Sequence, residues 1–269
     1  MLTFLFWNIN RKPLADAIAT IAEQESVDLL ILAECAIEDS ALLKTLNRRG
    51  PEFHFPSNLN SRIKLFTRFP GRYLVPSFDS DRVSIRRVAL PAREEILLVA
   101  VHLSSKLYWS AQSQAMECPN LSTTITEQER LAGHNRSVVV GDFNMNPFED
   151  GIVGAGGLHA VMSRKVAERG ERIVQGRAYP FFYNPMWGHL GDSLDRPTGS
   201  YYYERAEHVN YFWNTFDQVL LRPALMGRFR NDQLKILDRA GDLLLRMPDG
   251  RPDPKAASDH FPLLFRLDL

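Results

Sequence analysis

The chain has 269 residues, of which 45% are hydrophobic and 24% are charged, a composition typical of a globular protein with a buried core. Its 32 basic and 32 acidic residues give a formal net charge of zero, which excludes a global basic field that would attract nucleic acid nonspecifically. Two cysteines do not make a disulfide framework, and no apolar run reaches the roughly 20 residues of a membrane span. The first residues lack the basic region of a signal peptide, so we expect a soluble, cytoplasmic protein without a membrane partner.

The first third of the sequence alternates strands with helices. The apolar run at 2–7 predicts a buried strand, and helical spacing of apolar residues predicts a helix over 13–25. Residues 29–32 predict a second buried strand, and 39–48 a second helix that ends at a glycine. This order of elements predicts an α/β unit.

The middle of the sequence changes to consecutive strands. Four β-branched or aromatic segments leave no room for helices between them and predict an antiparallel meander: 62–69, 72–78, 82–90 and 94–103. A helix over 126–133 and a buried strand at 137–140 follow, and 144–197 is expected to be rich in loops. The remaining segments with strand character are 199–203, 210–221, 233–238, 242–246 and 261–267.

Polar residues of the kind that bind metal or transfer protons follow or begin many of these strands. They are Asn8, Glu34, His102, Asp142, Asn144, Asp217, Asp259 and His260. Taken singly, such residues are more typical of caps and turns. The combination is specific, because three valines precede Gly141-Asp142-Phe143-Asn144 and the sequence Ser258-Asp259-His260 lies close to the C-terminus. Carboxylates and carboxamides dominate the set, and these are the ligands that Mg²⁺ or Mn²⁺ prefers.

These blocks resemble the endonuclease/exonuclease/phosphatase superfamily, which includes deoxyribonucleases, apurinic-site endonucleases, sphingomyelinases and inositol-phosphate 5-phosphatases. The similarity runs in the family's order from Trp7-Asn8-Ile9 to Ser258-Asp259-His260, and so covers nearly the whole chain. It implies a deoxyribonuclease I-like α/β fold, with two packed sheets flanked by helices in four layers (α/β/β/α). It also implies a single domain over 1–269, with the site at the strand ends along one edge.

The resemblance further implies roles for individual residues. Glu34 would be the principal ligand of a Mg²⁺ or Mn²⁺ ion, with Asn8 and Asp259 close to it. His260 would lie against the scissile phosphate and would be oriented by Asp217.

For the remaining residues, Asp142 would position or deprotonate the attacking water, and Asn144 would donate to the phosphoryl oxygens. His102 would act as a general acid toward the leaving group, as a second histidine does in the deoxyribonuclease branch. That branch pairs this histidine with a glutamate, and none occurs around Ser61–Lys64. The tyrosine that the family often has near the Asp217 motif is also missing, and Gln218 follows Asp217 directly.

The superfamily contains several substrate classes, so the resemblance does not fix the substrate. Segments 62–87 and 164–177 are rich in arginine and lysine and are either a phosphate-binding surface or solvated faces of strands. Among the many aromatic residues of 179–213, Tyr202 and Phe212 are expected in the core, and Trp187 is the better candidate for stacking on a base.

Other substrate classes have less support in the sequence. No exposed apolar hairpin is evident that would suit a lipid substrate. The residues after Asn146 are acidic, unlike the basic motifs of inositol-phosphate phosphatases. We therefore expect a metal-dependent nuclease, with DNA weakly favoured over RNA. The alternatives are a phosphodiesterase or phosphatase acting on a small-molecule or lipid ester, and a non-catalytic binding protein of the same fold.

Overall fold

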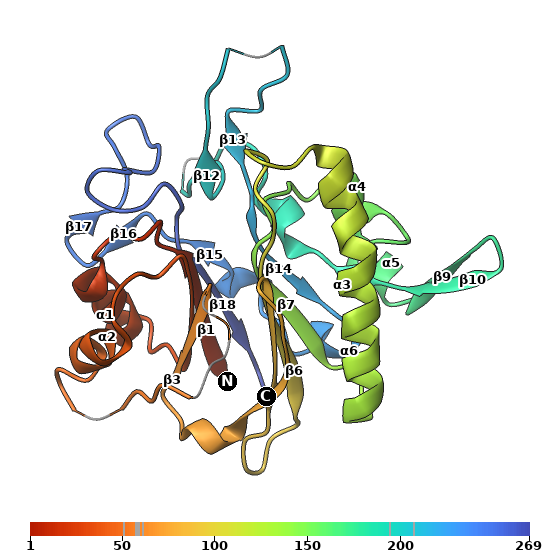
Figure 1. Ribbon diagram of the computed structural model, residues 1–269, viewed down its shortest axis with the longest axis horizontal. Coiled ribbons are helices and arrows are strands. Elements are labelled where there is room, and N and C mark those ends of the chain that lie inside the picture. The colour runs from red at the N-terminus through yellow and green to blue at the C-terminus, as the bar shows by residue number, and fades with distance from the viewer. Residues whose placement is uncertain (51, 57–59, 61, 194, 207) are drawn as a thin grey trace.

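Two β-sheets pack face to face in the computed structural model, which describes residues 1–50, 52–56, 60, 62–193, 195–206 and 208–269 (Figure 1). The first sheet has the strand order β15 (Lys235–Ile236), β18 (Leu263–Leu267), β1 (Leu2–Asn8), β2 (Leu29–Ala33), β3 (Ile63–Thr67). The second has the order β4 (Leu74–Asp79), β5 (Val83–Val88), β6 (Ile96–His102), β7 (Ser137–Asp142), β14 (Asp217–Leu221), β11 (Phe182–Tyr183), β8 (Ala160–Val161).

Helices cover the outer faces of both sheets, so the expected four layers are confirmed. The helices α1 (Ala15–Gln24) and α2 (Asp39–Leu46) lie on the first sheet, and α3 (Ala111–Ala132) lies along the second (Figure 1). The short helical segments are η1 (Gly71–Tyr73), α4 (Asp150–Val153), α5 (Arg164–Ala167), η2 (Pro185–His189), α6 (Pro223–Met226) and η3 (Asn231–Gln233). Three strand pairs lie outside the sheets: β9 (Glu171–Val174) with β10 (Arg177–Pro180), β12 (Tyr201–Tyr202) with β13 (Trp213–Asn214), and β16 (Arg239–Ala240) with β17 (Leu243–Leu244).

The central strands β6, β7 and β14 of the second sheet are buried on both faces. In β7, Val138 and Val140 belong to the core between the two sheets, whereas Val139 belongs to a second apolar cluster that includes Leu121 and Ile125 of α3. Strands covered on both faces are continuously apolar rather than alternating. This explains the run of valines before Gly141, which is followed by the first polar residues of the site.

The strand directions bring six strand ends to one edge. The parallel strands β1 and β2 finish there in register, and so do the parallel strands β6 and β7, in which His102 is opposite Asp142. The strands β14 and β18 are antiparallel to β7 and β1 and therefore begin at the same edge. A residue such as Asp217, which opens β14, is thus placed directly opposite Asp142.

The structure corrects several expected elements. The segment 62–69 is not part of the meander, because β3 pairs with β2 in the first sheet; the chain crosses to the second sheet through η1, and only β4, β5 and β6 form the antiparallel meander. The predicted helix over 126–133 is much longer and begins after Ser110, whose hydroxyl caps it. Its sequence signal was weak because the buried face includes Gln114, Gln128 and Glu129, and because Pro119 lies inside it.

Two loop and strand expectations also change. The loop-rich segment 144–197 contains the β9–β10 hairpin, whose turn at Gln175 and Gly176 has positive φ at both residues. The strand expected over 210–221 is divided into β13 and β14. No helix of the described residues is long and apolar enough to cross a lipid bilayer.

A buried ion pair joins α3 to the end of β14. The guanidinium Nε and Nη2 of Arg222 lie 2.8 and 3.2 Å from the two carboxylate oxygens of Glu129, and Arg222 Nη1 donates to the carbonyl of Phe181. Ser137 Oγ also donates to Glu129, at 2.7 Å. Both charged side chains are at least nine-tenths buried, so each charge needs the opposite charge of the other to offset the loss of water.

We expect Arg222→Met to lower the free energy of unfolding by about 3–5 kcal/mol, because it leaves the Glu129 carboxylate buried without its cation. Urea denaturation measures this loss. Adding Glu129→Leu to Arg222→Met should restore a large part of the stability. A double variant as unstable as the sum of the two single variants would contradict the interpretation.

Candidate active site

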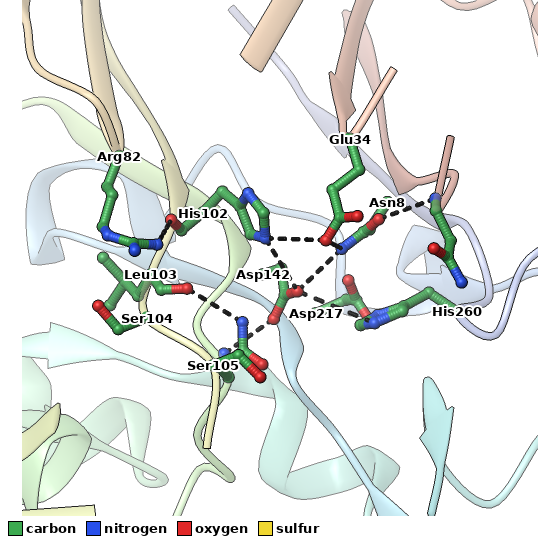
Figure 2. Close-up of polar contacts among 12 residues, drawn as sticks. Asn8, Glu34, Arg82, His102, Leu103, Ser104, Ser105, Asp142, Asp217 and His260 are labelled. Carbon is green, nitrogen blue, oxygen red and sulfur yellow. Dashed lines mark hydrogen bonds and ion pairs between the residues drawn. The ribbon is translucent and has the colours of Figure 1, made fainter. Parts of the chain in front are cut away.

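A cleft of about 740 Å³ lies at the edge where the strand ends meet. Seven of the eight residues singled out from the sequence line it: Asn8, Glu34, His102, Asp142, Asn144, Asp259 and His260. The eighth, Asp217, is fully buried and lies beneath His260. Figure 2 shows that the side chains of Asn8, Glu34, His102, Asp142 and His260 point toward one another across the strand ends. The structure therefore brings all eight residues together.

Backbone geometry at two of these positions is unusual. Glu34 and Asn144 both have positive φ angles, 48° and 51°, which non-glycine residues rarely adopt. Such conformations cost about 1–3 kcal/mol each and cluster at functional sites. Gly141, next to Asp142, is needed because a Cβ atom there would lie 1.9 Å from the carbonyl oxygen of Val101. Glycine thus lets β6 and β7 approach closely where His102 and Asp142 emerge.

A carboxylate orients the His260 ring. His260 Nδ1 lies 2.8 Å from Asp217 Oδ2, and His260 Nε2 lies 3.9 Å from Asp142 Oδ2. Burial by itself disfavours the charged ring, but the carboxylates of Asp217 and Asp142 raise the pKa of His260 to about 10. The imidazole is therefore cationic at neutral pH, between two carboxylates.

Asp142 connects the two halves of the site. Its Oδ1 accepts a hydrogen bond from the backbone N–H of Asn144 at 2.8 Å, and its Oδ2 accepts one from Asn8 Nδ2 at 3.1 Å. His102 Nε2 lies 3.8 Å from the same Oδ2. Asn144 uses one of its amide hydrogens to donate to the carbonyl of Leu103. The Asp142 carboxylate is thus fixed in place yet lines the cleft.

The neighbour of His102 is not the glutamate of the deoxyribonuclease pattern. The Nε2 atom of His102 lies 3.4 Å from Glu34 Oε1, whereas the Nδ1 atom of His102 is buried and has no hydrogen-bond partner among the described residues. The contact with His102 lowers the pKa of Glu34 to about 2, against the opposing effect of burial. Lys64, in the segment where that glutamate would be expected, contacts Asp39 and the carbonyl of Ile37, and Ser61 lies outside the described residues.

The donor set fits a hard divalent cation. Asn8, Glu34 and Asp259 line the same cleft, and carboxylate and amide oxygens are the ligands that Mg²⁺ and Mn²⁺ prefer. A compact trio of potential ligands also occurs at Asp142, Asp217 and His260. We favour the first set, because Asp217 is fully buried and its Oδ2 is already bonded to the protonated ring of His260.

The sequence left open whether the basic segments are a phosphate-binding surface or solvated strand faces, and the structure shows that only some of their side chains reach the cleft. In the segment 62–87, Arg62 and Arg82 line the cleft. Arg86 and Arg87 instead pair with Asp79 and Glu95, away from it. In the segment 164–177, Arg164 donates to backbone carbonyls of Met226 and Phe229. Only some of the basic side chains of these segments therefore face the cleft.

Arg11 and Tyr201 are among the cleft residues that were not singled out from the sequence. Arg11 follows the Trp7-Asn8-Ile9 block, and Tyr201 belongs to the aromatic-rich segment. The Tyr201 ring centroid lies 4.6 Å from that of His260. Burial raises the pKa of Tyr201 to about 12, so its hydroxyl stays protonated. The dense tyrosines at 201–203 were a signal that this segment is special, but they did not indicate which ring faces the site.

The expectation for Phe212 is wrong, and the structure gives the burial and the neighbours of Tyr202 and Trp187. Phe212 is 46% exposed and is not a core residue, which contradicts the prediction. Tyr202 is half-buried beneath Arg251, whose guanidinium carbon lies 4.8 Å from the ring centroid. Trp187 is half-buried and meets Phe148 edge to face, with ring centroids 6.5 Å apart.

The His260 geometry predicts a pH dependence of stability in metal-free protein. The pKa is raised in the folded state, from 6.5 to about 10, so the stabilisation is complete below about pH 6.5 and is lost as the pH rises toward 10. We expect wild-type protein in EDTA to lose about 1–3 kcal/mol more over this window than His260→Gln, as measured by urea denaturation. If the free energy of unfolding changed equally with pH in the two proteins, the protonation of His260 would not be coupled to folding.

The sequence matches no protein-family model and no curated protein. Solved structures do match over the full length of both chains. An endonuclease/exonuclease/phosphatase family protein from Leptotrichia buccalis is 12% identical with a TM-score of 0.57, and an AP endonuclease from Archaeoglobus fulgidus is 14% identical with a TM-score of 0.57; each comparison covers 100% of both chains. The 3′ phosphatase NExo from Neisseria, bound to a product DNA hairpin, is 14% identical with a TM-score of 0.56 and the same coverage. The chain therefore has the deoxyribonuclease I-like fold of the endonuclease/exonuclease/phosphatase proteins.

Proposed function

We propose that this chain is a divalent-metal-dependent phosphoesterase that hydrolyses nucleic-acid phosphodiesters, with DNA favoured. The observation that carries the proposal is the convergence of Glu34, Asp142 and the Asp217–His260 pair on one cleft. Neighbours of the same fold include an AP endonuclease and a phosphatase bound to DNA. The three arginines Arg11, Arg62 and Arg82 line the cleft and suit a polyanionic backbone.

In the proposed mechanism, the protein positions water and phosphate before the reaction. Asp142 accepts a proton from the attacking water, whose oxygen bonds to phosphorus. The cationic His260, held by Asp217, stabilises the negative charge that builds on the phosphoryl oxygens. Asn144, with one amide hydrogen not committed to Leu103, donates to the same oxygens. The bond to the leaving oxygen breaks as His102 supplies a proton to it.

A metal ion would be held by Glu34, Asn8 and Asp259. It would supply Lewis-acid stabilisation of the phosphoryl group and of the leaving oxygen. The low pKa of Glu34 keeps this carboxylate ionised throughout the physiological range and ready for a cation. Through its contact with His102, the proposed metal ligand Glu34 lies next to the proposed general acid.

A lipid phosphodiester is a second candidate, because exposed apolar side chains border the cleft. No exposed apolar hairpin was expected from the sequence, but the segment between β12 and β13 exposes Val209, Tyr211 and Phe212. The loop before α3 exposes Leu107, Tyr108 and Trp109. Apolar side chains of this kind can enter a membrane interface.

Hydrolysis of a substrate panel tests the proposal. The panel contains single- and double-stranded DNA, abasic duplex, RNA, bis-p-nitrophenyl phosphate and sphingomyelin vesicles, each with Mg²⁺, Mn²⁺ or EDTA. Glu34→Gln is the test variant, and Glu127→Gln, an exposed acid on α3, is its matched control. We expect metal-dependent cleavage of a nucleic acid that is lost in Glu34→Gln and retained in Glu127→Gln.

Other results would redirect the proposal. Cleavage of the generic diester alone would keep the chemistry and move the substrate to small molecules, and cleavage of the vesicles alone would select the lipid candidate. Absence of turnover on every substrate, with wild type and variants alike, would favour a non-catalytic binding protein.

A further inference from the structure

A second cavity, of about 240 Å³, opens directly beside the cleft. We call it the side groove and define it by its walls, the loop at 105–107 and the segment between β12 and β13. Four residues line both the cleft and the side groove: Ser105, Leu107, Asn144 and Tyr201. A group in the side groove would therefore lie next to a phosphate bound in the cleft.

Aromatic rings form the inner walls of the side groove. Tyr201 and Phe216 are stacked with ring centroids 5.2 Å apart and 25° between their planes. The ammonium of Lys106 lies 5.2 Å from the Phe216 ring centroid. Further along, the guanidinium of Arg205 lies 4.9 Å from the centroid of Tyr203. Flat rings interleaved with cations are typical of surfaces that stack nucleobases.

Tyr203, which lines the side groove, has a polar atom without a hydrogen-bond partner among the described residues. The hydroxyl of Tyr203 is buried, and no described residue forms a hydrogen bond with it. Buried polar groups are almost always satisfied, so we expect this hydroxyl to gain a hydrogen bond when a ligand or water occupies the side groove. The edge of a nucleobase offers such hydrogen-bonding groups, whereas an acyl chain offers none.

The aromatic surface continues out of the side groove. Tyr211 lines it and is 55% exposed, and its ring meets Phe148 edge to face at 5.3 Å between centroids. Phe148 in turn contacts Trp187, the residue that the sequence indicated for stacking. Asn210 braces this part of the chain by donating to the carbonyl of Arg205 and accepting from the N–H of Phe212. Tyr211, Phe148 and Trp187 thus form a row of rings in contact, of which Tyr211 belongs to the braced segment.

We propose that the side groove binds an unpaired nucleotide next to the scissile phosphate, so that the substrate is a single strand or an unpaired segment of nucleic acid. This deepens the proposed function and rests on it for the identity of the reacting phosphate. A base that is stacked and paired in a duplex cannot enter a ring-lined groove without being extruded, which costs a few kcal/mol. An unpaired nucleotide avoids that cost and gains the stacking.

Binding without turnover tests the inference. Fluorescence anisotropy in EDTA compares a labelled single-stranded oligothymidylate, a fully paired duplex of the same length and phosphatidylcholine vesicles. The variants are Tyr203→Ala and Tyr211→Ala. The matched control is Tyr73→Ala on η1, because the guanidinium of Arg72 lies 4.7 Å from the Tyr73 ring centroid, much as that of Arg205 lies over Tyr203. The segment η1 follows β3, which runs antiparallel to β2 and so leads away from the cleft edge.

We expect wild-type protein to prefer the single strand, and Tyr203→Ala and Tyr211→Ala each to weaken its binding about 5- to 100-fold, the range for one lost stack. Tyr73→Ala should bind like wild type. Hydrolysis of bis-p-nitrophenyl phosphate should also be unchanged in Tyr73→Ala.

Three outcomes separate this inference from the proposed function. Equal binding of duplex and single strand, or no effect of the two variants, would overturn the side groove as a nucleotide site even if DNA is cleaved. Vesicle binding that the variants abolish, with oligonucleotide binding intact, would overturn it in favour of a lipid. Single-strand binding that the variants weaken, without hydrolysis of any ester, would support the inference and remove the proposed function alone.

Discussion

His260→Gln is expected to lower kcat about 100- to 10,000-fold, with a much smaller change in KM. The ring is cationic because the carboxylates of Asp217 and Asp142 raise its pKa to about 10. In a buried site, a fixed positive charge stabilises the developing phosphoryl charge far more than it would in water. Glutamine keeps a hydrogen-bonding group of similar size but removes that charge. Steady-state kinetics with the generic diester measure the effect independently of nucleic-acid binding.

The control for this variant is another buried histidine. His159 is 2% exposed, its ring is stacked on Phe181 with centroids 4.2 Å apart, and it does not line the cleft. His159→Gln should therefore reduce stability without lowering kcat in the folded fraction. A similar loss of kcat in both variants would mean that His260 acts only through the fold.

Much of the site was predictable because it lies where buried strands end. The apolar runs that end before Asn8, Glu34 and Asp142 are visible in the sequence, and parallel strands finish at a common edge. The fold requires these polar residues to converge once β1, β2, β6 and β7 are arranged in this way. Their convergence at one edge could therefore be expected without knowing any loop.

The contacts of His102 and the side groove were not predictable in the same way. Glu34, which contacts His102, has a positive φ angle that no residue propensity indicates. The walls of the side groove come from loops at 105–107 and between β12 and β13, which are far apart in sequence. The helix α3 was underestimated because its buried face includes polar side chains, such as Gln114, which donates to the carbonyls of Ser104 and Asn144.

Asp142→Asn is the second substitution for which we expect a very large effect, a loss of about 100- to 10,000-fold in kcat. The carboxylate accepts from the Asn144 backbone and from Asn8, and its Oδ2 lies within 4 Å of His102 and His260. An asparagine has one carbonyl oxygen for these two donors, so its amide must face one of them. The substitution also removes the base proposed to take the proton from water.

The kinetic pattern distinguishes this role from metal binding. If Asp142 activates water, Asp142→Asn should lower kcat by a similar factor on nucleic acid and on the generic diester, and the Mg²⁺ concentration for half-maximal activity should stay close to the wild-type value. In Glu34→Gln that concentration should rise at least about tenfold, because a charged oxygen ligand is lost. Asp150→Asn, an exposed acid at the start of α4, serves as the control for the loss of one charge. A raised Mg²⁺ requirement in Asp142→Asn, with kcat restored at saturating metal, would instead place Asp142 among the ligands, as its proximity to Asp217 and His260 also allows.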